Sequence, residues 1–400
     1  MTPPKVLFVT TVDTTLVSFL LPYVRDLRQR GFRVEAATCL TRHGSSLARE
    51  LDALHDLPFT RSPLKLNNLR ALRALAALLR EEHYHLVHCH TPTASFLARL
   101  APRPARTRML YTAHGFHFHP QGTHLANWTY AILERLAAQR SDAVIVINEE
   151  DARAAVDHRI VARERLCRMH GIGVDTNHFA ATADGDARCV TMIAELIPRK
   201  RPADFLRLAA LLAPGLPDVE FQVLGDGPLR PRLERMAARL GLAGRLRFLG
   251  YQEDVRPALE RSALLVSCST QEGLPRAVLE AMAMHVPVLA TRIRGTHELL
   301  RDGCGFMVPV GNVPVLARYA RWILAHPEAA RSAAHRARER VVTRYGLERT
   351  LEEHEGIVAR LLSQWWRPPA RPRTPVEHRV PATTLTSRQP ADLANQASPP

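Results

Sequence analysis

The sequence predicts an α/β protein with two doubly wound parallel sheets that face each other across a central cleft. Short apolar stretches alternate with helical stretches, which is typical of parallel strands covered by helices on both faces of a sheet. The alternation pauses at residues 171–187, which we interpret as a linker, and then begins again. The chain has 400 residues, more than one hydrophobic core usually supports, so two domains are expected.

The first domain is expected to span residues 1–173. Its predicted strands are apolar stretches at residues 5–10, 32–38, 86–90, 109–113 and 143–147. Helices are expected between these strands, including one that ends near Gly31, one at 94–100 and one at 123–139. This order favours a sheet covered on both faces.

The second domain is expected to span residues 174–366. Its predicted strands lie at residues 189–194, 219–224, 246–249, 263–266, 287–290 and 305–308. Helices follow from about 314 to 366, and the sequence leaves open whether the last of them pack back on the first domain. Trp365 and Trp366 either pack against the body or contact a lipid interface. Residues 367–400 are rich in Pro and Arg and are predicted to be disordered.

The composition indicates acidic partners. The formal net charge of +15 favours nucleic acid, anionic lipid or phosphorylated substrates. The arginines are scattered over many helices and aromatic residues make up only 6%, which argues against a dedicated nucleic-acid-binding protein. A basic amphipathic helix is expected at residues 65–82. It packs on the sheet with a wet basic face, or it contacts anionic lipid headgroups.

The cysteines and the N-terminus indicate a cytoplasmic protein. The six cysteines are far apart and form no CxxC pair, so we expect reduced thiols. The chain enters its first strand almost directly, without the charged, apolar and small-residue sections of a secretory leader. It has no run of about 18 uninterrupted apolar residues, so no membrane-spanning helix is expected.

Residues 270–283 are the stretch around which the second domain is organised. They follow a buried strand, turn at Gly273 and enter a helix at Pro275. The first helical turn leaves unpaired N–H groups and a partial positive charge, which favour a bound phosphate. Glu272 precedes this helix and Glu280 lies roughly 7 Å along it. Two carboxylates beside a phosphate-binding helix end suit a diphosphate between two sugars, as in a nucleotide sugar.

The same residues allow a plainer interpretation. Glu280 and Arg276 are four residues apart and could form a solvated ion pair, while Glu272 could be an ordinary turn residue. A basic cluster with Arg199 and Lys200 also opens a helix. Because cations at a helix start oppose the dipole, this cluster favours phosphate binding over a solvated helix start.

Polar residues follow several predicted strands, where ligands bind in open parallel sheets. In the first domain they include Thr11, Asp13, His90 and His114, and in the second they include Gly225 and the 272–275 turn. Each could be a solvated loop residue, but their shared position at one edge of each sheet favours a site.

No metal site is predicted. The histidines between residues 85 and 119 lie on or beside strands and lack companion ligands at metal-binding spacing. Asp184-Gly185-Asp186 is similar to an acidic pair that holds a metal in other enzymes, but it lies in a linker of small residues, and chance explains it better.

Together these residues resemble the glycosyltransferase family 4 group, retaining enzymes with the GT-B fold of two Rossmann-like domains. The resemblance covers nearly everything from residue 5 to about 366. Glu272-Gly273-Leu274-Pro275 and Glu280 are similar to the E-x7-E signature of the family. Residues 171–179, 225–228 and 250–251 match further landmarks. Residues 10–13, 90–92 and 112–118 are similar to capsular and exopolysaccharide transferases in particular.

The resemblance implies roles for these residues. Glu280 would bind the ribose, Glu272 the hydroxyls of the donor sugar, and His114 would line the reacting centre, so Glu272 and His114 are the catalytic candidates. Other donor contacts would come from Gly273, Leu274, Pro275, Arg199, Lys200, Gly225, Gly250 and Tyr251, the last two near the base. The acceptor side would include Thr11, Asp13 and His90.

The implied reaction moves an N-acetylhexosamine or hexose from a nucleotide diphosphate, expected to be UDP, to a hydroxyl of a polyprenyl-diphosphate-linked saccharide. Anomeric configuration would be retained. Because cations and the helix end stabilise the departing diphosphate, no metal cofactor is expected. Such an enzyme would act at the inner membrane surface in capsular, exopolysaccharide or O-antigen biosynthesis, as a peripheral protein without a nucleic-acid partner.

One departure from the family pattern leaves alternatives open. The family often has Gly-Arg where this chain has Ala194-Glu195, so one phosphate-binding arginine is missing unless Arg199 replaces it. A catalytically inactive partner subunit that binds nucleotide or lipid is therefore the main alternative. A nucleotide-sugar epimerase of similar two-domain form is a weaker one.

Overall fold

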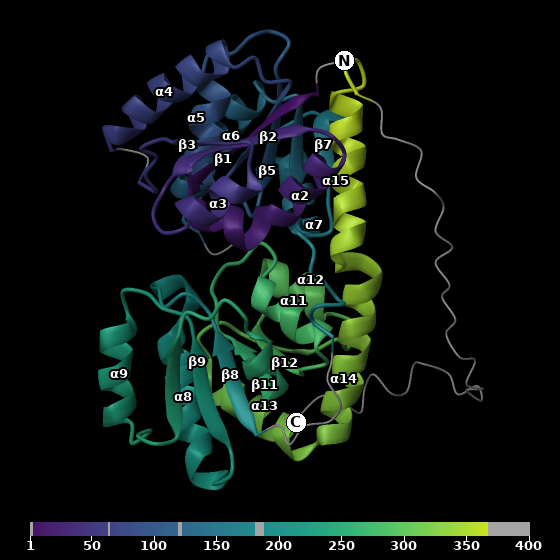
Figure 1. The fold of residues 1–400 in the computed structure, drawn as a ribbon. Helices are drawn as coiled ribbons and strands as arrows, with labels where there is room; N and C mark the ends of the chain where they lie inside the picture. The colour runs from purple at the N-terminus through teal and green to yellow at the C-terminus, as the bar shows by residue number, and fades with distance from the viewer. Residues whose placement is uncertain (1–2, 63–64, 119–121, 181–187, 367–400) are drawn as a thin grey trace, which may run out of the picture.

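The computed structural model describes residues 3–62, 65–118, 122–180 and 188–366. Two lobes, each built on one parallel sheet with helices on its faces, are stacked one above the other (Figure 1). The predicted α/β architecture of two doubly wound sheets is thus confirmed. The C-terminal tail and the Asp184-Gly185-Asp186 sequence lie outside the described residues.

The first sheet has seven parallel strands in the order β3-β2-β1-β4-β5-β6-β7. They are β1 (Lys5–Val12), β2 (Arg33–Cys39), β3 (Ala53–Asp56), β4 (Leu86–His90), β5 (Arg108–Ala113), β6 (Ala143–Val146) and β7 (Leu166–Arg168). The central strands are buried almost throughout; the run at residues 6–9 in β1 is continuously apolar, whereas β4 also buries His88 and His90. The edge strands β3 and β7 were not predicted, because β3 is half polar and β7 has only three residues.

Helices cover both faces of this sheet. The first helical segment runs through α1 (Asp13–Thr15), a π-helical turn (Leu16–Leu20) and α2 (Leu21–Gln29). The remaining helices are α3 (Gly44–Glu50), α4 (Asn67–Glu81), α5 (Pro92–Leu100), α6 (His124–Ala138) and α7 (Glu149–Asp157). The helix predicted at 65–82 is α4, which turns Ala71, Leu75 and Leu79 inward.

The second sheet has six parallel strands in the order β10-β9-β8-β11-β12-β13. They are β8 (Cys189–Ile193), β9 (Glu220–Leu224), β10 (Leu246–Gly250), β11 (Ser262–Ser267), β12 (Val288–Thr291) and β13 (Phe306–Val308). Its helices are α8 (Pro202–Leu212), α9 (Arg230–Arg239), α10 (Arg256–Glu260), α11 (Arg276–Ala283), α12 (Arg294–Leu300), α13 (Val313–Ala325) and α14 (Pro327–Arg340).

The last helix, α15 (Leu347–Leu361), leaves the second lobe and lies along the first (Figure 1). It continues from α14 through a π-helical turn (Val341–Tyr345) and packs against α2. Beyond it, the rings of Trp366 and Phe32 meet edge to face, with centroids 4.7 Å apart. Trp365 meets His85 in the same way, so both tryptophans pack against the body of the protein.

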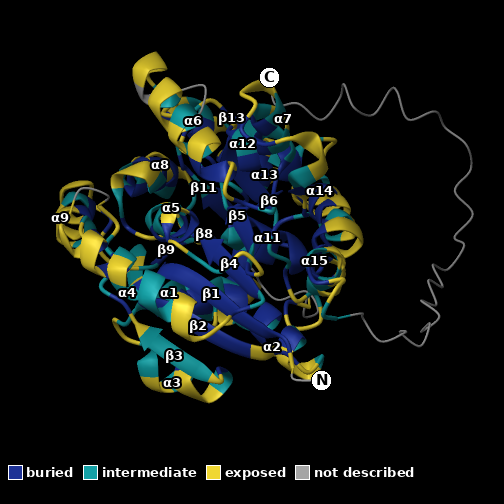
Figure 2. Cartoon of the chain, turned by 90° about the horizontal axis from the view of Figure 1, so that it is seen from above, coloured by how far each residue is buried: buried dark blue, intermediate teal, exposed yellow. Residues whose placement is uncertain are grey.

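Hydrophobic packing joins the two lobes. One cluster of buried residues contains side chains of both sheets and of the last helix, among them Phe8, Leu265 and Val358. Two further clusters lie within the first and the second lobe, respectively. Figure 2 shows most of the strands as the buried centre, together with α11, and shows outer helices such as α9 with exposed residues. Within the described residues, none of the helices has the length and hydropathy that crossing a bilayer requires.

Candidate functional site

A cleft of about 690 Å³ lies between the lobes, where the strands of both sheets end. Its first-domain wall includes Thr91, His114 and Gly115, which follow β4 and β5. Its second-domain wall includes Arg199, Lys200 and the whole turn before α11. Of the residues predicted to bind the donor, the structure brings Glu272, Gly273, Leu274 and Pro275 together with Arg199, Lys200 and His114.

The turn before α11 touches the first domain directly. A Cβ atom on Gly273 would lie 1.8 Å from the carbonyl oxygen of His114. A Cβ atom on Gly295 would lie 2.1 Å from the carbonyl oxygen of Gly273. Only residues without a side chain permit this stacking of three backbone segments. The turn is therefore packed between the residues after β5 in the first domain and the start of α12 in the second.

The N-terminus of α11 opens into the cleft. Arg276, Ala277 and Val278 of its first turn line the cleft, and Pro275 occupies the N-cap position. Among the residues that the structure describes, no side chain caps this turn. The leading N–H groups and the positive end of the helix dipole are therefore available to an anion.

Glu272 is held at this helix start by two basic residues and a hydroxyl. Its carboxylate forms an ion pair with Lys200. It also accepts a hydrogen bond of 2.7 Å from the Ser269 hydroxyl and lies 3.8 Å from Arg199 Nη1. Arg199 donates a further hydrogen bond to the Gln271 carbonyl at 3.1 Å. The carboxylate is 8% exposed, so its position is set by these partners.

Glu280 lies behind the cleft wall. Its carboxylate accepts a hydrogen bond of 2.6 Å from Arg276 Nε, so the ion pair considered from the sequence is present, although Glu280 is buried. Burial raises the pKa of Glu280, and the neighbouring Arg276 opposes that shift. The guanidinium of Arg276 lines the cleft and also bonds the Ser18 carbonyl of the first domain. Arg276 therefore stands between Glu280 and the cleft, a placement that spacing alone did not reveal.

A row of buried histidines backs the first-domain wall. His114 Nε2 lies 3.1 Å from His90 Nδ1, and the His90 ring lies against the His88 ring, with centroids 4.1 Å apart. His88 Nδ1 in turn lies 3.3 Å from Nε2 of His354 on α15. Burial lowers the pKa of His114 to about 4 and the pKa of His90 well below its ordinary value. The row is therefore neutral at physiological pH, and His90 contacts His114 instead of the cleft.

The other two predicted acceptor residues are buried, Thr11 near the end of β1 and Asp13 at the start of α1. The Asp13 carboxylate accepts hydrogen bonds from the Thr41 hydroxyl at 2.5 Å and from the backbone amides of Arg42 and His43 at 2.9 Å. Burial opposes ionisation, but these hydrogen bonds outweigh it and lower the pKa of Asp13. The Thr11 hydroxyl lies 2.8 Å from that of Thr91. Asp13 thus orders the loop after β2, and the structure does not bring it into the cleft.

A second interlobe cavity, of about 820 Å³, adjoins the first. Its second-domain wall includes Glu195, Gly225 and Tyr251. A Cβ atom on Gly225 would lie 2.0 Å from the Ala194 carbonyl oxygen, which explains the glycine. Arg61 reaches across from the first domain and lies 3.6 Å from the Glu195 carboxylate. Gly250 has a φ of +71° and precedes the exposed Tyr251 at the cavity rim.

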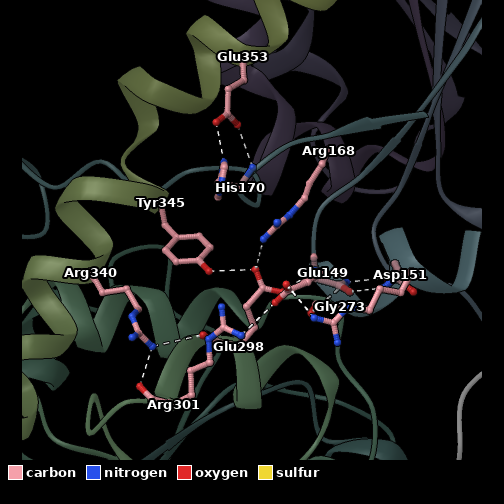
Figure 3. A network of polar contacts seen from close by, with 12 residues as sticks. Glu149, Asp151, Arg168, His170, Gly273, Glu298, Arg301, Arg340, Tyr345 and Glu353 are labelled. Carbon is pink, nitrogen blue, oxygen red and sulfur yellow. Dashed lines mark hydrogen bonds and ion pairs between the residues drawn. The ribbon is translucent and has the colours of Figure 1, made fainter. Parts of the chain in front are cut away.

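A polar network joins the lobes behind the Gly273 turn (Figure 3). Glu298, on α12, accepts a hydrogen bond of 2.6 Å from the backbone amide of Glu149 at the start of α7. It also bonds Arg168 at 3.2 Å and the Tyr345 hydroxyl at 3.1 Å. Arg301, at the end of α12, forms a second link to α7 through an ion pair of 3.0 Å with the Glu149 carboxylate. One carboxylate therefore ties α7, β7 and the turn before α15 to α12.

The same network reaches the site. Arg294 forms an ion pair with buried Asp151, and Asn148 donates a hydrogen bond of 3.5 Å to the Gly273 carbonyl. His170 donates its amide to Glu353 of α15 at 2.9 Å (Figure 3). The relative position of the lobes is thus fixed by charged groups within a few residues of the cleft. None of these partners was identified from the sequence, because they lie between 125 and 183 residues apart along the chain.

Family models match both halves of the chain. Residues 16–171 match the glycosyl transferase 4-like domain, and residues 174–340 match glycosyl transferases group 1. EpsD of Bacillus subtilis, named as a glycosyltransferase, is 33% identical over 372 residues, covering 88% of this chain and 96% of EpsD. An α-1,3-galactosyltransferase of Escherichia coli that acts on a GlcNAc-diphosphoundecaprenol is 28% identical, covering 62% of this chain and 68% of that enzyme.

Solved structures share the fold. HepE of Anabaena in complex with UDP superposes with a TM-score of 0.73 at 20% identity, covering 89% of this chain and all of HepE. The lipopolysaccharide glycosyltransferase WaaG superposes with a TM-score of 0.69 at 16% identity, covering 88% and 99% of the two chains. With two matching domain models and a relative of this identity and coverage, the chain belongs to the glycosyltransferase family 4 group and has the GT-B fold.

Proposed function

We propose that the protein is a retaining glycosyltransferase that moves a hexose or N-acetylhexosamine from a UDP-sugar to a hydroxyl of a polyprenyl-diphosphate-linked saccharide. The observation that carries the proposal is the uncapped start of α11 in the cleft, with Lys200, Arg199 and Glu272 around it. An anionic diphosphate fits this combination of helix end and cations.

In this arrangement the diphosphate lies against the first turn of α11 and Lys200, and its departure needs no metal. The donor sugar lies between Glu272 and His114, while the nucleoside extends toward Gly225 and Tyr251. Ribose binding by Glu280 requires Arg276 to turn away from it. Arg199, and Arg61 from the opposite lobe, supply positive charge near Glu195, where the family often has an arginine.

The acceptor class follows from the relatives. The E. coli enzyme and a Campylobacter jejuni transferase carry undecaprenol-linked acceptors in their names. With the charge of +15, they support a lipid-linked acceptor, peripheral association with the inner membrane from the cytoplasm, and a place in exopolysaccharide, capsule or O-antigen biosynthesis.

The test incubates purified protein with a panel of UDP-sugars and a polyprenyl-diphosphate-linked acceptor and detects the product by mass spectrometry. NMR of the product reports the anomeric configuration. Glu272→Ala is expected to abolish transfer, whereas Glu234→Ala, an exposed carboxylate on α9, serves as the matched control and stays active. Full activity of Glu272→Ala would overturn the site assignment.

Glu195 favours a second candidate, a non-catalytic partner subunit that binds nucleotide. This candidate predicts tight UDP binding without transfer or hydrolysis for any donor in the panel. Isothermal titration with UDP beside the transfer assay separates the two functions.

A further inference from the structure

Helix α6 has its apolar side turned to solvent. Leu125, Trp128, Ile132 and Leu136 follow one another at intervals of three or four residues and so form one stripe along the helix. Leu125 is 74% exposed, Trp128 65% and Leu136 56%. Leu133, beside the stripe, is 40% exposed. In Figure 2 the outer part of α6 protrudes from the body as an exposed segment.

The opposite side of α6 packs on the domain through small side chains and one acidic side chain. Glu134 accepts hydrogen bonds from Arg99 at 2.9 Å and from the Tyr111 hydroxyl at 3.3 Å. Arg99 is fully buried and stacks on the Tyr111 ring, with its guanidinium carbon 3.9 Å from the centroid. Ala137 and Ala138 complete the contact. A buried ion pair and small side chains thus hold the helix with its large apolar residues outward.

The orientation of α6 is opposite to that of α4, another surface helix of the same domain. In α4 the buried side chains are apolar except that of Asn68, and Arg70, Arg73 and Arg80 are exposed, as in an ordinary surface helix. In α6 the single acidic side chain points inward. Burying large apolar side chains is favourable by about 1.5–3 kcal/mol each, so an exposed stripe of this kind needs a partner.

Basic residues surround the C-terminal end of the stripe. Arg135 and Arg140 are exposed on and just beyond α6. Arg140 donates to the Leu100 carbonyl at 2.9 Å, and Arg103 donates to the Arg140 carbonyl at 2.6 Å, so these arginines cluster with the exposed end of α5. Leucine and tryptophan rimmed by arginine is the combination that binds an anionic lipid surface.

The helix begins beside the cleft. His117, which lines the cleft, contacts Tyr130 of α6 with ring centroids 5.3 Å apart. We propose that the outward face of α6, formed by Leu125, Trp128, Ile132, Leu133 and Leu136, inserts into an anionic bilayer surface and so places the cleft beside the membrane. The proposal deepens the membrane part of the proposed function and rests on it for the benefit to catalysis, but the docking itself can be tested separately.

The first experiment is vesicle flotation with the full-length protein. Wild type is expected to float with phosphatidylcholine vesicles that contain phosphatidylglycerol, and less with phosphatidylcholine alone. The variant Leu125→Ser/Trp128→Ser/Leu136→Ser changes exposed side chains only and is expected to bind about tenfold more weakly or worse. Leu66→Ser/Leu69→Ser, which alters two exposed leucines at the start of α4, is the matched control and is expected to float as wild type does.

Tryptophan fluorescence adds a local readout. Trp128 is one of four tryptophans, and the other three are half-buried in the structure. The emission is expected to shift to the blue on vesicle binding, and Trp128→Phe is expected to remove most of that shift while the protein still floats.

Three results would overturn the proposal. They are unchanged flotation of the triple variant, flotation lost equally in the α4 control, or a wild-type dimer in light scattering that the triple variant breaks while neither protein binds vesicles. UDP titration on the same samples separates the two proposals. Vesicle binding without UDP binding removes the function and keeps the docking surface, and the reverse result removes only the docking surface.

Discussion

The two walls of the cleft use different chemistry. The second-domain wall is ionic, with Lys200, Arg199 and Glu272 gathered at the start of α11. The first-domain wall is neutral, because His114 and the histidines behind it are buried and keep low pKa values. The ionic wall suits a group whose charge grows as a bond breaks, and the neutral wall suits sugar hydroxyls. Charge and hydrogen bonding are thus divided between the domains.

Lysine 200 gives the strongest test of this division. Lys200→Ala is expected to lower kcat/KM by roughly 10²–10³, the usual cost of removing one group that stabilises a departing anion. The measurement is steady-state transfer, with Arg207→Ala, an exposed cation on α8, as control. Wild-type kinetics in Lys200→Ala would show that the ionic wall does not hold the diphosphate.

Histidine 354 tests whether the buried histidines behind the first-domain wall are uncharged in the folded protein. In the unfolded chain His354 has a pKa of 6.5, whereas burial in the folded protein lowers this pKa to about 4. Stability is therefore complete above pH 6.5 and falls as the pH drops toward 4. At pH 5 this group alone should cost about 2 kcal/mol, roughly 30-fold in the unfolding equilibrium.

The measurement for this prediction is urea unfolding at pH 7 and pH 5. His354→Gln is expected to reduce the loss between the two pH values, and His335→Gln, an exposed histidine on α14, should leave it unchanged. An identical loss in His354→Gln would mean that the row is protonated already in the folded state.

Histidine 114 sharpens the comparison at the proposed reacting centre. His114→Gln is expected to lower kcat about tenfold, because one hydrogen-bonding group near the sugar is displaced, and to leave UDP affinity unchanged. Isothermal titration with UDP beside transfer kinetics separates the two effects. Weakened UDP binding in this variant would place diphosphate contacts on the first-domain wall as well.

The smallest effect is expected at Glu195. Glu195→Gln removes a carboxylate that lies beside the cleft and pairs with Arg61, so UDP should bind a few-fold more tightly, by roughly 0.5–1 kcal/mol for a partly exposed charge. Titration at two salt concentrations checks the electrostatic origin, because salt screens an exposed charge. Weaker binding would mean that Glu195 positions Arg61 for the ligand.

Local patterns predicted the fold and parts of both walls of the candidate cleft. Alternating apolar stretches located the central strands, and the residues that follow β5 and β11 gave His114 and the Gly273 turn. Contacts between residues far apart along the chain could not be predicted from local sequence patterns. His354 meets His88 across 266 residues, and nothing in either segment indicates the other. The hydrogen bonds that occupy the Asp13 carboxylate could not be predicted either, because their donors lie in a loop 28 to 30 residues later.

Two cases show that the position of a residue along a helix does not tell what its side chain faces. The spacing of Glu280 and Arg276 allowed either a ligand contact or an ion pair, and the structure contains the ion pair. The stripe of α6 could be recognised from its spacing, but a sequence normally implies that such a stripe faces the core. The inward pairing of Glu134 with Arg99 reverses that expectation, and only the tertiary structure contains it.

The return of α15 to the first lobe has a consequence for biosynthesis. Arg30 pairs with Glu355, and Phe32 packs against Trp366, so α2 and the strand after it are covered by the last residues of the described chain. Domains usually fold as they leave the ribosome, starting with the N-terminal one. Here the N-terminal lobe is synthesised first, and its apolar surface at α2 stays exposed until translation has passed residue 366.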